Sequence, residues 1–325
     1  MPILDNKEPT TTLILGISAC LAGQPVRYNG QHKRAHFCLH TLADFAQLRP
    51  VCPEMGIGLG APRPPIRLVA TDGGTRARGS DDSQLDVTDQ LDEFGQRWGA
   101  AHGELDGFIL TQKSPSCGME RVKVYRANGY PASFDGEGVF ARALHLSQPL
   151  LPIEEEGRLH DPHLRENFFT RCYTYRTWKE QLGAKPNHRA LLAFHSRHKY
   201  LLMAHNPAEC SALGRLIAQR PADAQMATLC DHYIHRCMAL LRRVATRRGH
   251  TNTLLHLLGY LKGKLSPPER GELLEGIHAY HQGQLPLVVP LRMMRHYLRL
   301  HGSAYVQQQR YLMPHPTALG LHNAI

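Results

Sequence analysis

The chain has 325 residues, of which 42% are hydrophobic, and a formal net charge of +10 at pH 7. It has no run of about 18 apolar residues, so we expect no membrane-spanning segment. Its polar start, Met1 to Thr12, lacks the apolar stretch of a secretory signal. The eight cysteines do not indicate a dense disulfide framework, and we expect a cytoplasmic protein whose cysteines are free thiols or metal ligands.

The charge is distributed unevenly along the chain. Residues 1–175 contain 18 Lys and Arg against 21 Asp and Glu, whereas residues 176–325 contain 20 against 7. A basic part joined to a near-neutral part is typical of a nucleic-acid-binding domain attached to another domain, although a merely soluble basic surface is an alternative. We therefore expect two domains, 1–175 and 176–325, with the boundary between about 175 and 190.

The first part predicts an α/β domain with a Rossmann-like open parallel sheet, because apolar runs alternate with segments of helical spacing. Expected strands run into Cys20 and Cys52, and another covers 107–110, with the sheet continuing through 122–125. Helical spacing is present over 37–48 and 86–102. The first of these helices completes a β–α–β unit.

Three cysteines share one setting, because Cys20, Cys52 and Cys117 each follow an apolar run and lie among polar residues. The carboxyl ends of strands in an open parallel sheet meet where ligands bind, so the three thiols can converge. Three thiolates leave one coordination position open and favour an iron–sulfur cluster or zinc. The alternative is that they are buried structural thiols. The other five cysteines lack this setting.

Polar residues near these cysteines are candidates for chemistry. Glu54, two residues after Cys52, can act as acid or base, or is an exposed turn residue. In the loop before Cys117, the hydroxyls and backbone N–H groups can orient a carbonyl or thiocarbonyl, or form an ordinary turn. The candidates in this loop are Lys113, Ser114 and Ser116. A basic loop that can contact phosphate or a polar substrate, or is simply exposed, contains Arg27, Lys33 and Arg34.

The second part predicts an all-α bundle without a convincing strand. A helix is expected to begin at Asp161 and Pro162, with Asp161 as its N-cap. Further helices are expected over 188–205, 207–219, 225–248, 254–265, 267–280 and 290–301.

Basic side chains in this bundle can contact RNA phosphates. Those within the segment 194–200 are His195, Arg197 and Lys199, and those at the expected end of the helix 225–248 are Arg242, Arg243, Arg247 and Arg248. The alternatives are a satisfied polar core for the first group and a solvated helix end for the second. His195 and His198 have the spacing to share a metal, but no third ligand is evident.

Three segments carry a resemblance to a known family. Gly16–Gly30, Val51–Leu68 and Lys113–Gly118 occur in the order found in TudS-type thiouracil desulfidases, and the match covers roughly residues 13–150. The resemblance implies a 4Fe-4S cluster held by Cys20, Cys52 and Cys117, with the fourth iron capturing the substrate's sulfur. It also implies that Glu54 is the acid/base and Ser114 the active-site serine, with Ser116 close enough to compete for that assignment.

The segment from Phe194 onward resembles a helical domain often fused to such desulfidases. The two-domain form is similar to the RudS group, which removes sulfur from 4-thiouridine in tRNA. We therefore expect a cytoplasmic enzyme that converts 4-thiouridine in tRNA to uridine by a net hydrolysis, with no DNA or membrane partner. Alternatives are a desulfidase of free thiouracil or thiouridine nucleotides, and a non-enzymatic RNA-binding protein with a structural metal.

Overall fold

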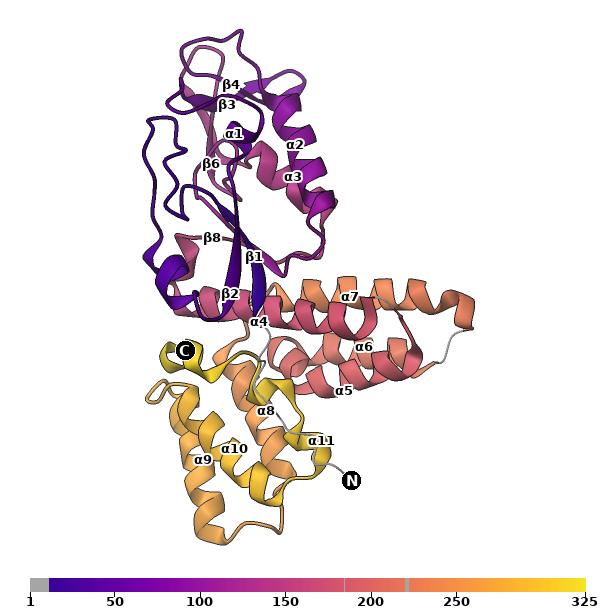
Figure 1. Ribbon diagram of the computed structural model, residues 1–325. Coiled ribbons are helices and arrows are strands. Elements are labelled where there is room, and N and C mark those ends of the chain that lie inside the picture. Colours follow the sequence, from indigo (N-terminus) through magenta and orange to yellow (C-terminus); the bar gives the residue numbers. More distant parts are fainter. Residues whose placement is uncertain (1–11, 184, 220–221) are drawn as a thin grey trace. The chain divides into compact units, whose positions relative to one another are not determined.

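A computed structural model describes residues 12–183, 185–219 and 222–325 (Figure 1). It separates the chain into two compact units, Thr11–His160 and, in the C-terminal part, Asp161–Ile325. The first eleven residues, on which the expectation about a secretory signal depends, lie outside the described residues.

The unit boundary lies earlier than the expected boundary at 175/176. Helix α4 (Pro162–Trp178) belongs to the helical unit, because its side chains pack there. The Trp178 ring lies 5.1 Å from Phe194 and 5.8 Å from Tyr233. With the observed boundary, residues 161–325 contain 22 Lys and Arg against 9 Asp and Glu, so the basic excess remains in the helical unit.

The first unit contains a four-stranded parallel sheet, as expected. Its strand order is β2 (Ala46–Val51), β1 (Leu13–Ser18), β5 (Gly107–Leu110) and β8 (Ile153–Glu155). Residue 16 of β1 is glycine, which leaves room for the Phe108 side chain of β5, because a Cβ at this position would lie 2.2 Å from the Phe108 ring. The parallel register places the carboxyl ends of β1, β2 and β5 together.

A second sheet in this unit corrects the expectation of one continuous sheet. Its order is β4 (Gly74–Gly79), β3 (Ile66–Thr71), β6 (Val122–Tyr125) and β7 (Pro131–Gly136). Strands β3 and β6 are parallel, and the two outer pairs are antiparallel. Both inner strands follow Pro- and Gly-containing loops that take the chain out of the first sheet, and β6 pairs with β3 instead of β5.

Helices α2 (Thr88–Ala101) and α3 (Val139–Ser147) pack side by side in this unit (Figure 1). The first confirms the helix expected over 86–102. The helix expected over 37–48 is wrong: only a π-helical turn, Phe37–Thr41, forms, since the chain is already extended in β2 from Ala46. A short helix, α1 (Pro53–Gly56), begins directly after Cys52.

The second unit is helical, as expected, and its described residues contain no strand. Its helices after α4 are α5 (His188–His205), α6 (Pro207–Ala218), α7 (Met226–Leu241), α8 (Arg247–Gly259), α9 (Pro267–His281), α10 (Val288–His301) and α11 (Ala304–Gln307). Side-chain caps start several of them, because free N–H groups of a first turn need acceptors. Asp161 caps α4, Asn206 caps α6, and Ser266 with Glu269 forms the capping box of α9.

The helices expected over 225–248 and 254–265 are placed wrongly. The chain leaves α7 after Leu241 and starts α8 at Arg247, where the Thr246 hydroxyl accepts a hydrogen bond from the Gly249 N–H at 3.1 Å. A Cβ on Gly249 would lie 2.0 Å from the Ala204 carbonyl oxygen. The glycine therefore allows the start of α8 to pack directly on α5.

Among the described residues, no helix has both the length and the apolar character that crossing a membrane requires.

Candidate active site

The three cysteines of the shared setting line one cavity in the first unit. It has a volume of about 410 Å³ and lies at the carboxyl ends of β1, β2 and β5. Cys20, Cys52 and Cys117 contribute to its wall together with Glu54. The strands place these side chains because each chain segment leaves the sheet at the same edge.

The thiols have few polar partners. The Cys20 Sγ lies 3.0 Å from the Thr111 hydroxyl oxygen, and the Cys52 Sγ lies 3.8 Å from the Val26 carbonyl oxygen. Burial raises the pKa of the Cys52 thiol, and it raises the pKa of the Cys117 thiol well above its ordinary value, with neighbouring Cys52 adding to the effect. A metal group bound here must therefore displace protons from these thiols.

The chemistry of the donor set indicates which metal group fits the cavity. Cys20, Cys52 and Cys117 line it, and no histidine is among the described residues that form its wall. Thiolate ligands suit iron–sulfur clusters and zinc. Three thiolates can hold a 4Fe-4S cluster and leave one iron without a protein ligand, so these residues fit such a cluster.

Glu54 is fixed from both sides. The Ser116 hydroxyl donates a hydrogen bond to its Oε1 at 2.7 Å, and Arg63 donates to its Oε2 from both Nε and Nη2 at 2.7 Å. Glu54 lies in the first turn of α1, so its backbone is placed by the same turn that follows Cys52. The carboxylate is therefore held at the cavity wall in one orientation.

Arg63 is a site residue that the sequence reasoning missed. Its guanidinium is buried, and its Nη1 also donates to the carbonyl oxygens of Val26 (2.9 Å) and Gly60 (2.6 Å). The available signal was an arginine flanked by Pro62 and Pro64 in a loop that forms a pocket wall. The rigid segment fixes the orientation of the Arg63 side chain. Its partner, Glu54, lies nine residues earlier, and sequence spacing alone does not identify that pair.

The loop before Cys117 has its own internal support. The Ser114 hydroxyl accepts hydrogen bonds from the N–H groups of Ser116 (3.2 Å) and Cys117 (3.1 Å). Lys113 adopts a left-handed conformation with φ of 60°. This conformation is uncommon for residues other than glycine and marks a tightly shaped loop. Ser114 therefore shapes the loop, whereas Ser116 contacts Glu54.

The start of α3 packs against this loop. The N–H groups of Val139 and Ala141 donate to the carbonyl oxygens of Pro115 and Ser116, both at 3.1 Å. Residue 138 is glycine, where a Cβ would lie 2.5 Å from the Ser116 carbonyl oxygen. The helix and the cysteine loop thus hold each other in place.

The basic candidates of the first unit separate into two groups. Arg27 and Lys113 line the cavity. Lys33 forms an ion pair with Glu156 at 2.6 Å, and Arg34 is exposed; neither lines the cavity. The structure therefore brings Arg27 and Lys113 to the cavity, whereas a substrate contact by Lys33 or Arg34 stays a prediction.

The candidates on α5 are poorly placed for RNA. His195 is buried, its Nδ1 lies 3.0 Å from the Tyr233 hydroxyl, and burial lowers its pKa to about 4. It is a neutral core residue at physiological pH, which contradicts its prediction as an RNA contact. Arg197 is half-buried and donates hydrogen bonds to the Ala193 carbonyl oxygen and the Gln181 side-chain oxygen. Lys199 is also half-buried.

The four arginines are exposed and flank one turn, with Arg242 and Arg243 after α7 and Arg247 and Arg248 starting α8. Arg247 has a structural role, because it donates to the Tyr280 carbonyl oxygen at 2.7 Å and its guanidinium carbon lies 5.1 Å from the Tyr280 ring centroid. Arg243 and Arg248 keep the exposure that phosphate contacts require.

Comparisons with known proteins match a different family to each of the two structural units. Residues 15–156 match the family described as 2-thiouracil desulfurase, and residues 199–316 match a family of unknown function, DUF1722. The uncharacterized protein YbgA of Escherichia coli (strain K12) is 33% identical over 135 residues, which are 42% of this chain and 80% of YbgA. The uncharacterized protein YbbK of Bacillus subtilis (strain 168) is 30% identical over 151 residues, or 45% of this chain and 97% of YbbK.

A solved structure, the [4Fe-4S]-dependent thiouracil desulfidase TudS, is 29% identical with a TM-score of 0.35, covering 46% of this chain and 95% of that chain. The cavity-lining cysteines and Glu54 all fall within residues 15–156. The chain therefore belongs to the 2-thiouracil desulfurase family and carries a DUF1722 region after its desulfurase domain.

Proposed function

We propose that the chain removes sulfur from 4-thiouridine in tRNA and leaves uridine in its place. The observation that carries this proposal is the cavity at the strand ends, where three thiols and an oriented carboxylate meet inside the segment that matches the desulfurase family. The basic excess of the helical unit supports a polyanionic substrate.

Cys20, Cys52 and Cys117, which line one cavity, would hold a 4Fe-4S cluster. When bound, such a cluster on three thiolates supplies one iron with a free coordination position, a Lewis acid to which a thiocarbonyl sulfur binds well. Thr111 lies against the Cys20 sulfur at 3.0 Å and can donate to its thiolate form.

Glu54 acts as the acid and base of the reaction in this proposal. Its carboxylate can accept the proton of a water molecule that attacks C4 of the base, and can return it as the C–S bond breaks. Ser116 and Arg63 hold the carboxylate in one orientation, which a proton transfer requires. Ser114 positions the base only indirectly, by shaping the loop.

The helical unit would bind the tRNA backbone, and the thiolated base would enter the cavity after leaving its stack. Arg242, Arg243 and Arg248 are the phosphate contacts proposed from the predicted set, since all three are exposed and Arg247 is engaged with Tyr280. Arg27 and Lys113 at the cavity would meet the phosphate or the polar edge of the bound nucleotide.

The proposal is tested with anaerobically reconstituted protein and thiolated tRNA, digested to nucleosides after incubation. We expect 4-thiouridine to decrease and uridine to replace it, and we expect Cys117→Ala to abolish this conversion with loss of bound iron and sulfide. His256→Gln, an exposed position on α8, serves as the control. If the same preparation desulfurates free thiouracil but leaves tRNA unchanged, the substrate is a free base and the tRNA proposal is wrong.

A further inference from the structure

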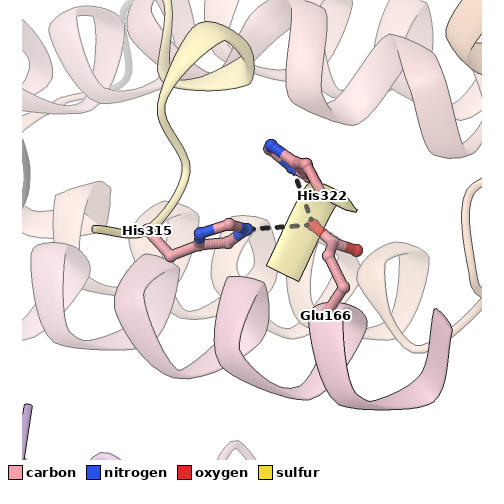
Figure 2. A group of neighbouring side chains, drawn as sticks. All are labelled: Glu166, His315 and His322. Carbon is pink, nitrogen blue, oxygen red and sulfur yellow. Dashed lines mark ion pairs between the residues drawn. The ribbon is translucent and has the colours of Figure 1, made fainter. Parts of the chain in front are cut away.

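The helical unit contains a second cluster of metal-binding side chains, formed by Glu166, His315 and His322 (Figure 2). Glu166 lies on α4, and both histidines lie in the C-terminal segment. Their three ligand atoms all lie within 4.8 Å of one another. We propose that this cluster is a binding site for a divalent transition-metal ion, zinc in particular, which joins the C-terminal segment to α4. The proposal does not depend on the proposed function.

The distances in the cluster fit a metal better than they fit hydrogen bonds. The Nε2 atoms of His315 and His322 lie 3.6 Å and 3.5 Å from the same carboxylate oxygen, Oε1 of Glu166 (Figure 2). A charge-assisted N–H···O hydrogen bond is shorter, near 2.8 Å. Ligands at about 2.1 Å from one tetrahedral ion are separated by about 3.4 Å, close to what is observed.

The burial of the cluster favours such a partner. The side chains of His315 and Glu166 are 3% and 9% exposed, and the His315 Nε2 is a buried atom that makes no hydrogen bond. A buried polar nitrogen without a partner is costly, and a metal ion would satisfy it.

The local chain is shaped to bring the ligands together. Gly320 lies between the two histidines and has a positive φ of 62°, a conformation that glycine adopts readily, so the chain reverses there. Thr170, one turn after Glu166 on α4, donates to Glu166 Oε1 at 2.8 Å and holds the carboxylate.

The ligand chemistry selects the type of ion. Two imidazole nitrogens and one carboxylate suit zinc and its neighbours, whereas calcium and magnesium need mainly oxygen ligands. His315 and His322 also line a cavity of about 240 Å³, which has room for a water molecule as the fourth ligand.

Zinc stoichiometry of the full-length protein tests the site. Chelator-treated protein is titrated with Zn²⁺ in competition with a chromophoric chelator. Because thiols such as those of the active-site cavity can also bind zinc, the informative quantity is the difference in bound zinc between variants. We expect His315→Gln/His322→Gln to bind one equivalent less than wild type and His256→Gln to bind as much as wild type. Equal stoichiometry in wild type and the double variant would overturn the proposal.

Two further measurements apply if the double variant does not fold. Glu166→Gln keeps the size of the side chain but removes its charge, and we expect at least tenfold weaker zinc binding at this site. In wild-type protein, the Co²⁺ spectrum should contain the visible bands of a tetrahedral nitrogen and oxygen site in addition to any thiolate charge-transfer bands. A Co²⁺ spectrum with thiolate bands alone would also overturn the site.

Discussion

At the scale of single residues, the site depends on how Glu54 is held. Two serines of the same loop were candidates for the active-site serine, and they make different contacts. Ser116 donates to Glu54 at 2.7 Å, whereas Ser114 accepts from two backbone N–H groups. The resemblance pointed to Ser114, and the geometry gives Ser116 the direct link to the carboxylate.

These contacts predict different effects of two matched substitutions. Ser116→Ala removes a hydrogen bond to a charged group, worth about 1.5 to 3 kcal/mol, so we expect kcat to fall roughly 10- to 100-fold with iron content unchanged. Ser114→Ala frees two N–H groups of the cysteine loop, so we expect it to reduce cluster retention. Iron and sulfide assays beside single-turnover rates separate the two. Loss of iron in Ser116→Ala, or full activity in it, would contradict the assigned role.

At the scale of elements, the cysteine loop and the start of α3 form one structural piece. The Pro115 and Ser116 carbonyl oxygens accept the first N–H groups of the helix, and Gly138 lies where no larger residue fits. The loop is therefore positioned by a helix that begins more than twenty residues after it. No spacing pattern in the sequence reveals this dependence.

Gly138→Ala tests whether the cysteine loop depends on its contact with the start of α3. The φ of residue 138 is −64°, which alanine adopts without strain, so the expected effect comes only from the contact of the new Cβ with the Ser116–Cys117 peptide. We expect cluster content and turnover to fall at least severalfold while far-UV circular dichroism stays unchanged. Gly73→Ala, where the added Cβ meets nothing within 4 Å, is the matched control. Equal activity of the two variants would show that the contact is unimportant.

Elements with a strong local sequence signal were predicted correctly. N-cap residues and helical periodicity of hydrophobic residues predicted α5, α6 and α9, and apolar runs predicted β1 and β5. The helix predicted over 225–248 is wrong because α7 ends at Leu241 and α8 begins at Arg247. Gly249 in α8 packs against α5, a contact between distant residues that a local pattern does not contain. The cysteines and Glu54 were found from their shared strand-end setting, whereas Arg63 depends on a contact that only the fold creates.

At the scale of the whole molecule, the chain combines a near-neutral desulfurase unit with a basic helical unit. The prediction of two domains of different charge survives the shift of the boundary, because moving residues 161–175 leaves the basic excess unchanged. What charge alone could not predict is which basic residues are available. His195 is buried, and Arg247 is engaged with Tyr280.

The salt dependence of tRNA binding tests the remaining basic candidates. If Arg243 and Arg248 each neutralise a phosphate, Arg243→Gln/Arg248→Gln should reduce the slope of log Kd against log salt by about 1.5. Arg49→Gln/Arg97→Gln removes the same charge from exposed positions of the other unit and should leave the slope nearly unchanged. Fluorescence anisotropy over a range of salt concentrations measures both. Equal slopes in the two double variants would show that Arg243 and Arg248 are not part of the tRNA-binding surface.

In the proposed reaction, the three-cysteine cavity replaces the sulfur of tRNA-bound 4-thiouridine with oxygen from water. The most direct measurement is mass spectrometry of uridine from thiolated tRNA after incubation with reconstituted enzyme in water labelled with oxygen-18. We predict that each uridine formed carries one heavy oxygen atom, with one sulfide released. The absence of uridine formed from bound 4-thiouridine, or uridine that carries no label, would contradict this reaction.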